Sequence, residues 1–199
     1  MRNPLVVGQR VYLRPLELSD AAEIAWHAAT EAETFMERWR RPASPLAFEH
    51  WITDMHKQRP PDTICLAICL IRDDTLLGDV GLHEIDWVHR HAETGSWIGL
   101  KEYRGSGYGT EAKHLLLEYA FEHLHLHVLS SWVWEPNARS AAALLKQGYK
   151  PAGRTKWTEV QHGYYRDTLL FDVLREDWLA ARDRANPAPS SREEMGEHG

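Results

Sequence analysis

Three strand-like runs follow one another between residues 63 and 100, and they constrain the fold more than any other part of the chain. The runs are TICLAICLIRDD, TLLGDVGLHEIDWVH and HAETGSWIGL, separated by polar turns at Asp73-Asp74 and at His89 to His91. Short turns join neighbouring strands in antiparallel order. The sequence therefore predicts an antiparallel meander, whose first strand is buried on both faces because its apolar residues are continuous.

Helical and strand-like runs surround this meander and predict a mixed α/β fold. Residues 9–17 alternate as a first strand, and Ser19 or Asp20 is expected to cap a helix over AAEIAWHAA. Two further runs before the meander, EAETFMERW and LAFEHWITDMHKQ, have apolar residues at helical spacing. After the meander we expect a helix over GYGTEAKHLLLEYAFEHL, a strand over HVLSSWVW, a helix over NARSAAALLKQ, and two strands over YKPAGRTKWTEV and YYRDTLLFDVL. The strand at 128–134 is then available for parallel pairing with 91–100.

Length and charge limit the functional class. A chain of 199 residues is long enough for one domain, while the Pro-, Ser- and Glu-rich residues 185–199 are expected to be a disordered tail. No run has the roughly 18 apolar residues that a membrane helix needs, and the N-terminus lacks a signal-peptide core, so we expect a cytoplasmic protein. A net charge of −6 without a Lys/Arg stripe argues against nucleic acid and favours a cationic amine or a partly basic partner.

The cysteines and histidines give little sign of a metal site. Cys65 and Cys69 should point to one side of a single strand, where a disulfide is geometrically poor, so we expect buried, inert thiols. His123, His125 and His127 would share a strand face only if the first of them lay in the strand. We expect His123 to lie at a helix end, and no carboxylate or cysteine completes the cluster, so no metal is predicted.

The stretch YRGSGYGTEA is predicted to be a glycine-rich turn leading from a strand into a helix. A helix N-terminus has unpaired N–H groups and a partial positive charge, and glycines without a Cβ let a ligand approach the backbone. An anion such as a phosphate suits this turn. The spacing Arg104-x-x-Gly107-x-Gly109 is neither the dinucleotide fingerprint nor the phosphate-loop pattern, so a plain strand-to-helix turn remains the alternative.

Taken together, three segments resemble the GNAT N-acetyltransferase superfamily, and more narrowly its Rim-type branch, which acetylates protein N-termini. They are AETGSWIGLKEYRGSGYGTEA, EPNARSAAALLKQGYKPAGR and GYYRDTLLFDVLREDW, within a resemblance that covers residues 9–178. The resemblance implies an α+β fold: a mixed, mostly antiparallel twisted sheet of six to seven strands, splayed at the middle and flanked by four to five helices. It also allows a homodimer.

The resemblance implies acetyl-CoA as the co-substrate. Amides of the glycine turn would bind its diphosphate, and strand residues would pair with its pantetheine arm as an added strand does. Asn137 would contact the same arm, although it is also placed to cap the next helix, and the two roles are compatible. The residues assigned to the diphosphate are Arg104, Gly105, Gly107, Tyr108, Gly109 and Thr110, and those assigned to the arm are Trp97, Ile98 and Leu100.

Acetyl transfer needs a neutral amine, a site for the developing oxyanion and a proton for the leaving thiolate. Many GNAT enzymes protonate the thiolate with a tyrosine at the position of Leu144, whereas the Rim-type resemblance implies Ser140 instead. The alternative for Ser140 is a helix residue bonded to backbone. Glu93 is one candidate for the base, with His83 and Glu84 as others, none of them favoured by spacing, and a solvent-facing Glu93 is the alternative.

The sequence thus predicts an acetyl-CoA-dependent N-acetyltransferase that acts on a primary amine by direct attack in a ternary complex. The expected acceptor is the α-amine of a peptide or protein. The alternatives are a small-molecule amine acetyltransferase, for an aminoglycoside or polyamine, and a non-catalytic acyl-CoA-binding protein, which the absence of the tyrosine permits. Trp26, Trp39 and Trp51 lie in helices that would wall the acceptor site, although core packing explains them as well.

Overall fold

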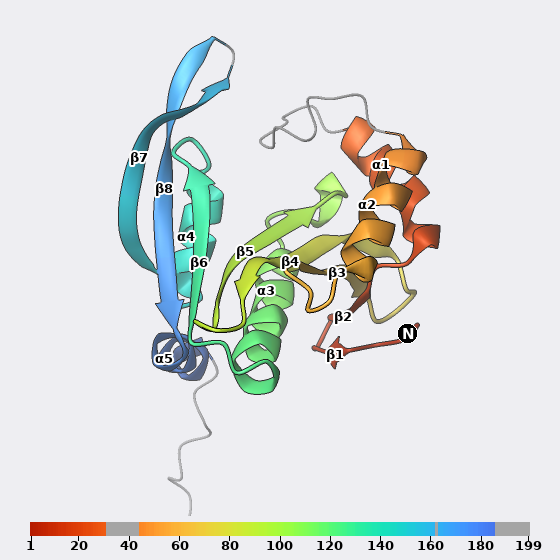
Figure 1. Ribbon diagram of the computed structural model, residues 1–199, viewed down its shortest axis with the longest axis horizontal. Coiled ribbons are helices and arrows are strands. Elements are labelled where there is room, and N and C mark those ends of the chain that lie inside the picture. Colours follow the sequence, from red (N-terminus) through yellow and green to blue (C-terminus); the bar gives the residue numbers. More distant parts are fainter. Residues whose placement is uncertain (31–43, 162, 186–199) are drawn as a thin grey trace, which may run out of the picture.

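Within residues 1–30, 44–161 and 163–185, which the computed structural model describes, eight strands form one sheet in the order β1-β2-β3-β4-β5-β6-β8-β7 (Figure 1). Neighbouring strands are antiparallel except β5 and β6, which are parallel. This confirms the predicted mixed sheet, and the additional strand is the two-residue β1, which is too short to show alternation. The strands are β1 (Val6–Val7), β2 (Val11–Pro15), β3 (Ile64–Leu70), β4 (Leu76–Asp86), β5 (His91–Ile98), β6 (Val128–Trp134), β7 (Lys150–Gln161) and β8 (Tyr164–Leu174).

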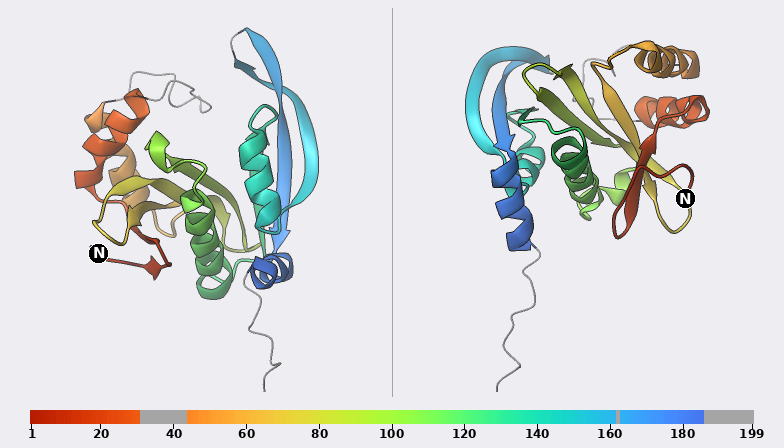
Figure 2. Two further views of the ribbon diagram at one scale, coloured as in Figure 1. Left: turned by 180° about the vertical axis from the view of Figure 1, so that it is seen from behind. Right: turned by 60° about the horizontal axis from the view of Figure 1, so that its bottom comes forward.

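Helices cover both faces of this sheet: α3 and α4 lie on one face, and α1 and α2 pack on the other (Figure 2). The expected helix over EAETFMERW and the expected tail over 185–199 lie outside the described residues, apart from residue 185. The helices are α1 (Ala21–Ala29), α2 (Pro45–Lys57), α3 (Tyr108–Glu118), α4 (Ala138–Lys146) and α5 (Arg175–Ala185), with short turns η1 (Leu18–Asp20), η3 (Lys101–Tyr103) and the π-helical η4 (Tyr119–His123).

The helix α5 was not predicted, because its sequence REDWLAARDRA has little apolar periodicity. It packs through few side chains, chiefly Trp178, which is 1% exposed, and Ala181. The domain that the sequence placed at 9–178 therefore ends inside this helix.

Strand alternation divides the apolar core into two clusters on opposite sides of the sheet. Val11 and Leu13 of β2 pack with α3, whereas Tyr12 packs with α1 and α2. Cys65 and Cys69 of β3 both lie in the second cluster and are buried free thiols, as the sequence predicts. Each cluster buries apolar area on its own face, so the sheet is held from both sides.

The two halves of the sheet meet along a short seam between β5 and β6. The parallel register joins His91–Glu93 to Val128–Ser130, and the strands then diverge into the open V of Figure 1, which confirms the predicted splay. Hydroxyl groups bridge the point of divergence: Thr94 Oγ1 donates to the Ser130 carbonyl (2.9 Å), and Ser131 Oγ donates to the Thr94 carbonyl (2.9 Å). Since the Thr94 hydrogen is used, the Tyr149 hydroxyl donates to Thr94 Oγ1 at 2.7 Å.

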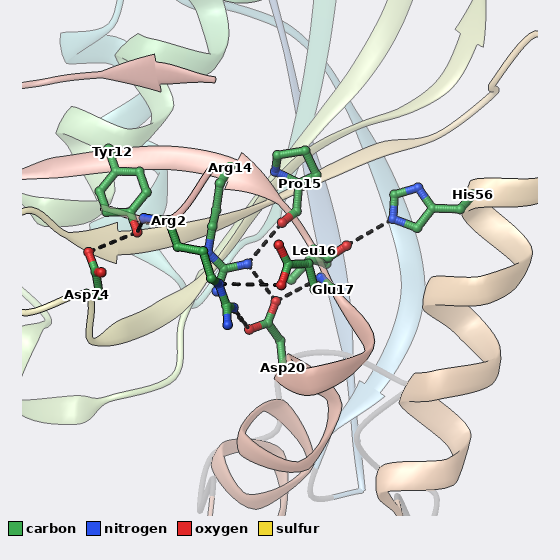
Figure 3. A network of polar contacts seen from close by, with 9 residues as sticks. All are labelled: Arg2, Tyr12, Arg14, Pro15, Leu16, Glu17, Asp20, His56 and Asp74. Carbon is green, nitrogen blue, oxygen red and sulfur yellow. Dashed lines mark hydrogen bonds and ion pairs between the residues drawn. The ribbon is translucent and has the colours of Figure 1, made fainter. Parts of the chain in front are cut away.

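A buried ion pair fixes the first helix to the sheet (Figure 3). The Arg14 guanidinium of β2 donates two hydrogen bonds of 2.7 Å to the carboxylate of Asp20, where α1 begins. Asp20 is the N-cap residue of α1, as predicted, but its carboxylate accepts from Arg14 and from the Glu17 amide rather than from the helix. Burial alone would raise the pKa of Asp20, but these donors outweigh burial and lower it. On α2, His56 Nε2 lies 2.9 Å from the Leu16 carbonyl and fastens that helix as well.

Candidate functional site

The divergence of β5 and β6 opens a cleft of about 720 Å³, which α3 and α4 border on one face of the sheet. This volume is in the range of small-molecule sites, roughly 300–1,000 Å³. The structure places most of the predicted site residues in its lining, although Leu100 and Tyr108 stand outside it. The predicted residues in the lining are Glu93, Trp97, Ile98, Arg104, Gly105, Gly107, Gly109, Thr110, Asn137 and Ser140.

The glycine turn enters α3 through two left-handed residues. Gly105 has φ +77° and Gly107, the N-cap of α3, has φ +87°, a region that L side chains rarely adopt. Without a side chain, Gly107 leaves the first amides of α3 uncovered by a capping group. The turn therefore presents a helix N-terminus to the cleft, where an anion is favoured.

The turn is anchored to the start of β2, a contact that the sequence did not predict. Arg10 donates to the Ser106 carbonyl (2.9 Å) and to Glu111 Oε2 (2.8 Å), and its guanidinium lies 4.5 Å from the Tyr108 ring centroid. Glu111 Oε1 accepts the amides of Gln9 and Arg10, both at 2.7 Å. Burial would raise the pKa of Glu111, but these donors lower it. The turn is thus preorganised by charged hydrogen bonds from outside the cleft.

Arg104 turns towards the end of β5. Its Nε donates to the Ile98 carbonyl (2.7 Å) and its Nη2 donates to the Gly99 carbonyl (3.1 Å). The sequence placed this charge beside a diphosphate. In the structure the guanidinium lines the cleft while it ties the glycine turn to the strand that enters the turn.

The helix α4 begins and ends as the sequence predicts. Asn137 Oδ1 accepts the Ser140 amide at 3.1 Å, which confirms the N-cap, and Gly148 follows the helix with φ +97°. A Cβ on Gly148 would lie 2.6 Å from the Asp177 carbonyl oxygen, so this position requires glycine. Ser140 in the first turn and Leu144 one turn later both line the cleft.

Glu93 is half-buried on the face of the sheet opposite α3. Alternation along β5 puts it on the side of Trp97, which packs with the α1 and α2 cluster. Its Oε1 accepts from Trp132 Nε1 at 2.8 Å, so it does not point freely to solvent. Burial raises the pKa of Glu93 above its ordinary value, against the Trp132 hydrogen bond. His83 is its register partner on β4 and also lines the cleft, whereas Glu84 does not.

Lys113 is a cleft residue that the sequence interpretation missed. Its side chain, from α3, is 3% exposed, and its Nζ lies 6.0 Å from the Tyr149 ring centroid. Burial lowers the pKa of Lys113 to about 7, although the charge of Glu93 opposes this. The available signal was spacing: Lys113 follows Gly109 by four residues and so shares its helix face.

A metal centre finds no support in the described part of the chain, where no group of three or more His, Cys, Asp or Glu side chains could hold an ion. His123 ends η4, and His127 precedes β6, so the histidine run is not on one strand. Among the same residues, no helix combines the length and the apolar character needed to cross a membrane. Trp26 is exposed, Trp51 packs against the α1 and α2 cluster, and Trp39 lies outside the described residues.

Comparison with known proteins gives the family. A model described as "Acetyltransferase (GNAT) domain" matches residues 10–150. The chain is 27% identical over 176 residues to "Putative ribosomal N-acetyltransferase YdaF" of Bacillus subtilis, covering 86% of this chain and 95% of that protein.

Two solved structures share the fold. RimJ from Mycobacterium smegmatis in complex with CoA-disulfide has a TM-score of 0.72 at 24% identity, covering 88% of both chains. Spermidine N-acetyltransferase from Vibrio cholerae in complex with CoA and spermine has a TM-score of 0.75 at 23% identity, covering 86% of this chain and 99% of that one. The relative named as a ribosomal N-acetyltransferase supports the Rim-type branch, whereas the RimJ structure, at 24% identity, shows the shared fold alone. The family model matches most of this chain. The chain therefore belongs to the GNAT acetyltransferase family and is an acetyltransferase.

Proposed function

We propose that the protein transfers the acetyl group of acetyl-CoA to the α-amine of a peptide or protein, by direct attack in a ternary complex. The observation that carries the proposal is the cleft itself. In the cleft, the N-terminus of α3, which follows two left-handed glycines, lies near the part of β5 that is no longer paired with β6. Few ligands need both an anion site and a strand edge, and a diphosphate joined to an amide-bearing arm is one of them.

The residues present fit acetyl-CoA, which supplies an acetyl group activated as a thioester. The N-terminus of α3 and the basic side chains of Arg104, Arg139 and Lys146, all in the cleft lining, suit phosphate groups. Beyond Glu93 in the described chain, β5 has no paired neighbour on the β6 side. Trp97 pairs with Asp79 of β4 and the Ile98 carbonyl accepts from Arg104, so the Ile98 N–H, which alternation directs away from β4, is the group available to the arm. Asn137 lies across the cleft, at the start of α4.

The same residues suit acetyl transfer to an amine. Glu93, whose pKa is raised by burial, accepts a proton from the attacking amine directly or through water. An N–H of the diverging part of β5, at Ile98 or a neighbour, donates to the thioester carbonyl. The Ser140 hydroxyl, in the first turn of α4, donates a hydrogen bond to the leaving sulfur.

The lining favours a peptide amine over a polyamine. Glu93 is the one acid among the described lining residues, whereas a polycation prefers a site with several carboxylates. The name of YdaF, a putative ribosomal N-acetyltransferase, supports a protein acceptor. A small-molecule amine is the second candidate, favoured by the net charge of −6 and by the fold shared with a spermidine acetyltransferase.

Thermal unfolding with and without acetyl-CoA tests the cofactor, and CoA release then tests the acceptor. A ligand at about 100 times Kd adds about 2.7 kcal/mol, which raises Tm by roughly 5–11 °C for a chain of this size. We expect that shift with acetyl-CoA and not with adenosine. Peptides with free α-amines should then release CoA faster than spermidine or aminoglycosides do. No thermal shift would refute the cofactor, and faster turnover of spermidine would refute the peptide acceptor.

A further inference from the structure

A buried ammonium group lies next to the point where β5 and β6 part. Lys113 projects from α3 into the cleft lining, and its Nζ stands over the ring of Tyr149. The Tyr149 hydroxyl bonds Thr94, the first β5 residue beyond the seam. Within the described residues, Nζ has no hydrogen-bond or ion-pair partner, so its donors are free for a ligand.

Lys113 and Glu93 approach the gap between the diverging ends of β5 and β6 from opposite faces of the sheet. Ala92 and Ile98 pack with the α3 cluster, whereas Trp97 packs with the α1 and α2 cluster. Alternation along β5 therefore assigns Glu93 to the α1 and α2 face and Thr94 to the α3 face. A group in the gap has a carboxylate on one side and an ammonium on the other, which is the arrangement that a concerted gain and loss of protons requires.

We propose that the Lys113 ammonium donates the proton that the sulfur of coenzyme A takes up when the acetyl group leaves. This inference rests on the proposed function. The amine nitrogen forms a bond to the thioester carbonyl carbon and gives its proton to Glu93 or water, and the carbon–sulfur bond breaks. The sulfur keeps that electron pair and takes a proton from Nζ, giving the free thiol. Glu93 or the water releases the amine proton to solvent and neutral Lys113 regains one, so the sum is amine plus acetyl-CoA to amide plus CoA.

The surroundings of Lys113 suit a proton donor that must be reprotonated after each turnover. Burial lowers the pKa of Lys113 to about 7, with the charge of Glu93 opposing the shift, and a general acid works best when its pKa is near the working pH. The other charged and titratable groups in the cleft lining are His83 on β4, Tyr103 on η3, Arg104 beside the turn, and Arg139 and Lys146 on α4, while the buried Tyr149 packs beneath the ammonium.

Lys113 supplies a proton donor that the other residues assigned to the leaving sulfur do not provide. Leu144 stands where the resemblance places a tyrosine acid, and its side chain cannot donate a proton. Ser140 can donate a hydrogen bond, but an alcohol is a weak acid. The two groups divide the work: Ser140 orients the sulfur, and Lys113 supplies the proton.

The test compares wild type, Lys113→Met, Lys113→Arg and the control Lys101→Met, whose side chain is exposed and lies outside the cleft lining. Calorimetry gives the Kd for acetyl-CoA, and steady-state kinetics across pH gives kcat with the best acceptor. Lys113→Met should lower kcat by about 10²–10⁴-fold with little change in Kd, and it should remove the loss of activity that wild type shows as pH rises above about 7. Methionine replaces a buried charge, so the fold should be kept, as the unfolding temperature of the unliganded protein would verify.

Three results would overturn the proposal while wild type remains active: an unchanged kcat in Lys113→Met, an unchanged alkaline limb, or full activity in Lys113→Arg. The last would mean that charge is sufficient, because arginine does not give up its proton. Acetylated Lys113 accumulating in the intact-mass spectrum would also overturn it, since the lysine would then be an acceptor. A wild type without acetyl-CoA binding or turnover would refute the proposed function, and this inference with it.

Discussion

Replacing Gly107 by valine tests the glycine turn as the diphosphate site. Gly107 is the N-cap of α3 at φ +87°, and a Cβ built there lies 3.1 Å from Arg10 Nη2. The near atom is the end of a half-exposed, flexible side chain that can move by a few tenths of an ångström. The steric cost inside the protein is therefore small, and the main structural cost is the left-handed backbone.

The expected magnitudes follow from these two features. A left-handed L residue costs about 1–2 kcal/mol, which lowers Tm by roughly 2–8 °C in a chain of this length. A branched side chain at the mouth of the turn should also break the contact of at least one amide with the diphosphate. A hydrogen bond to a charged group is worth about 1.5–3 kcal/mol, so Kd for acetyl-CoA should rise roughly 10- to 150-fold.

Calorimetric titration of acetyl-CoA into folded Gly107→Val, with Gly163→Val as the matched control, separates the two effects. Gly163 has φ +80° with nothing within 4 Å of an added Cβ, and it lies in the β7–β8 turn, outside the cleft lining. Both variants should lose similar stability, and only Gly107→Val should lose affinity. Equal Kd values for Gly107→Val and wild type would refute the placement of the diphosphate, and equal weakening in both variants would assign the effect to strain.

Three further substitutions test other parts of the structure. Ser140→Ala should lower kcat more than it raises KM for acetyl-CoA, because its hydroxyl bonds the sulfur most strongly as charge develops there; a silent substitution would leave Ser140 a purely helical role. Glu93→Gln should abolish the acidic limb of the kcat profile, along which wild-type activity falls as pH drops through a pKa that burial raises; an unchanged limb would assign the base elsewhere. Asp20→Asn should cost about 3–5 kcal/mol in urea unfolding at neutral pH, because buried Arg14 loses its carboxylate. Since folding lowers the pKa of Asp20, its stabilisation is complete above the ordinary value of 3.8 and is lost as pH falls through the folded value, so wild type and variant should converge in acid; a gap that persists there would contradict this.

Features set by local chemistry were predictable from the sequence. The meander follows from apolar runs separated by polar turns, and Asn137 and Gly148 bound α4 because an amide side chain caps a helix start and glycine tolerates the left-handed exit. The parallel seam could be anticipated from the helix that connects its two strands. These features depend on residues close together in the chain.

Features that depend on distant residues were not predictable in the same way. Arg10 and Glu111 are 101 positions apart in the chain, and no pattern in either segment predicts that they are in contact. Lys113 has the residue type of a solvated helix face, and its burial depends on side chains from distant segments, such as Tyr149, that pack around it. The helix α5 is rich in charge, and packing of Trp178 and Ala181 rather than periodicity decides where it lies.

The short seam between β5 and β6 also has a mechanical consequence. Backbone pairing between the two halves of the sheet is confined to His91–Glu93 and Val128–Ser130, so we expect the sheet to bend most easily where that pairing ends. A long ligand bound between the diverging strands would stiffen this part of the sheet, because it would add hydrogen bonds to the side of β5 that has no paired strand beyond Glu93. The β5 amides beyond Glu93 that alternation directs away from β4 should then exchange with solvent deuterium faster than those of the β6–β8 ladder, and should slow when that ligand is bound.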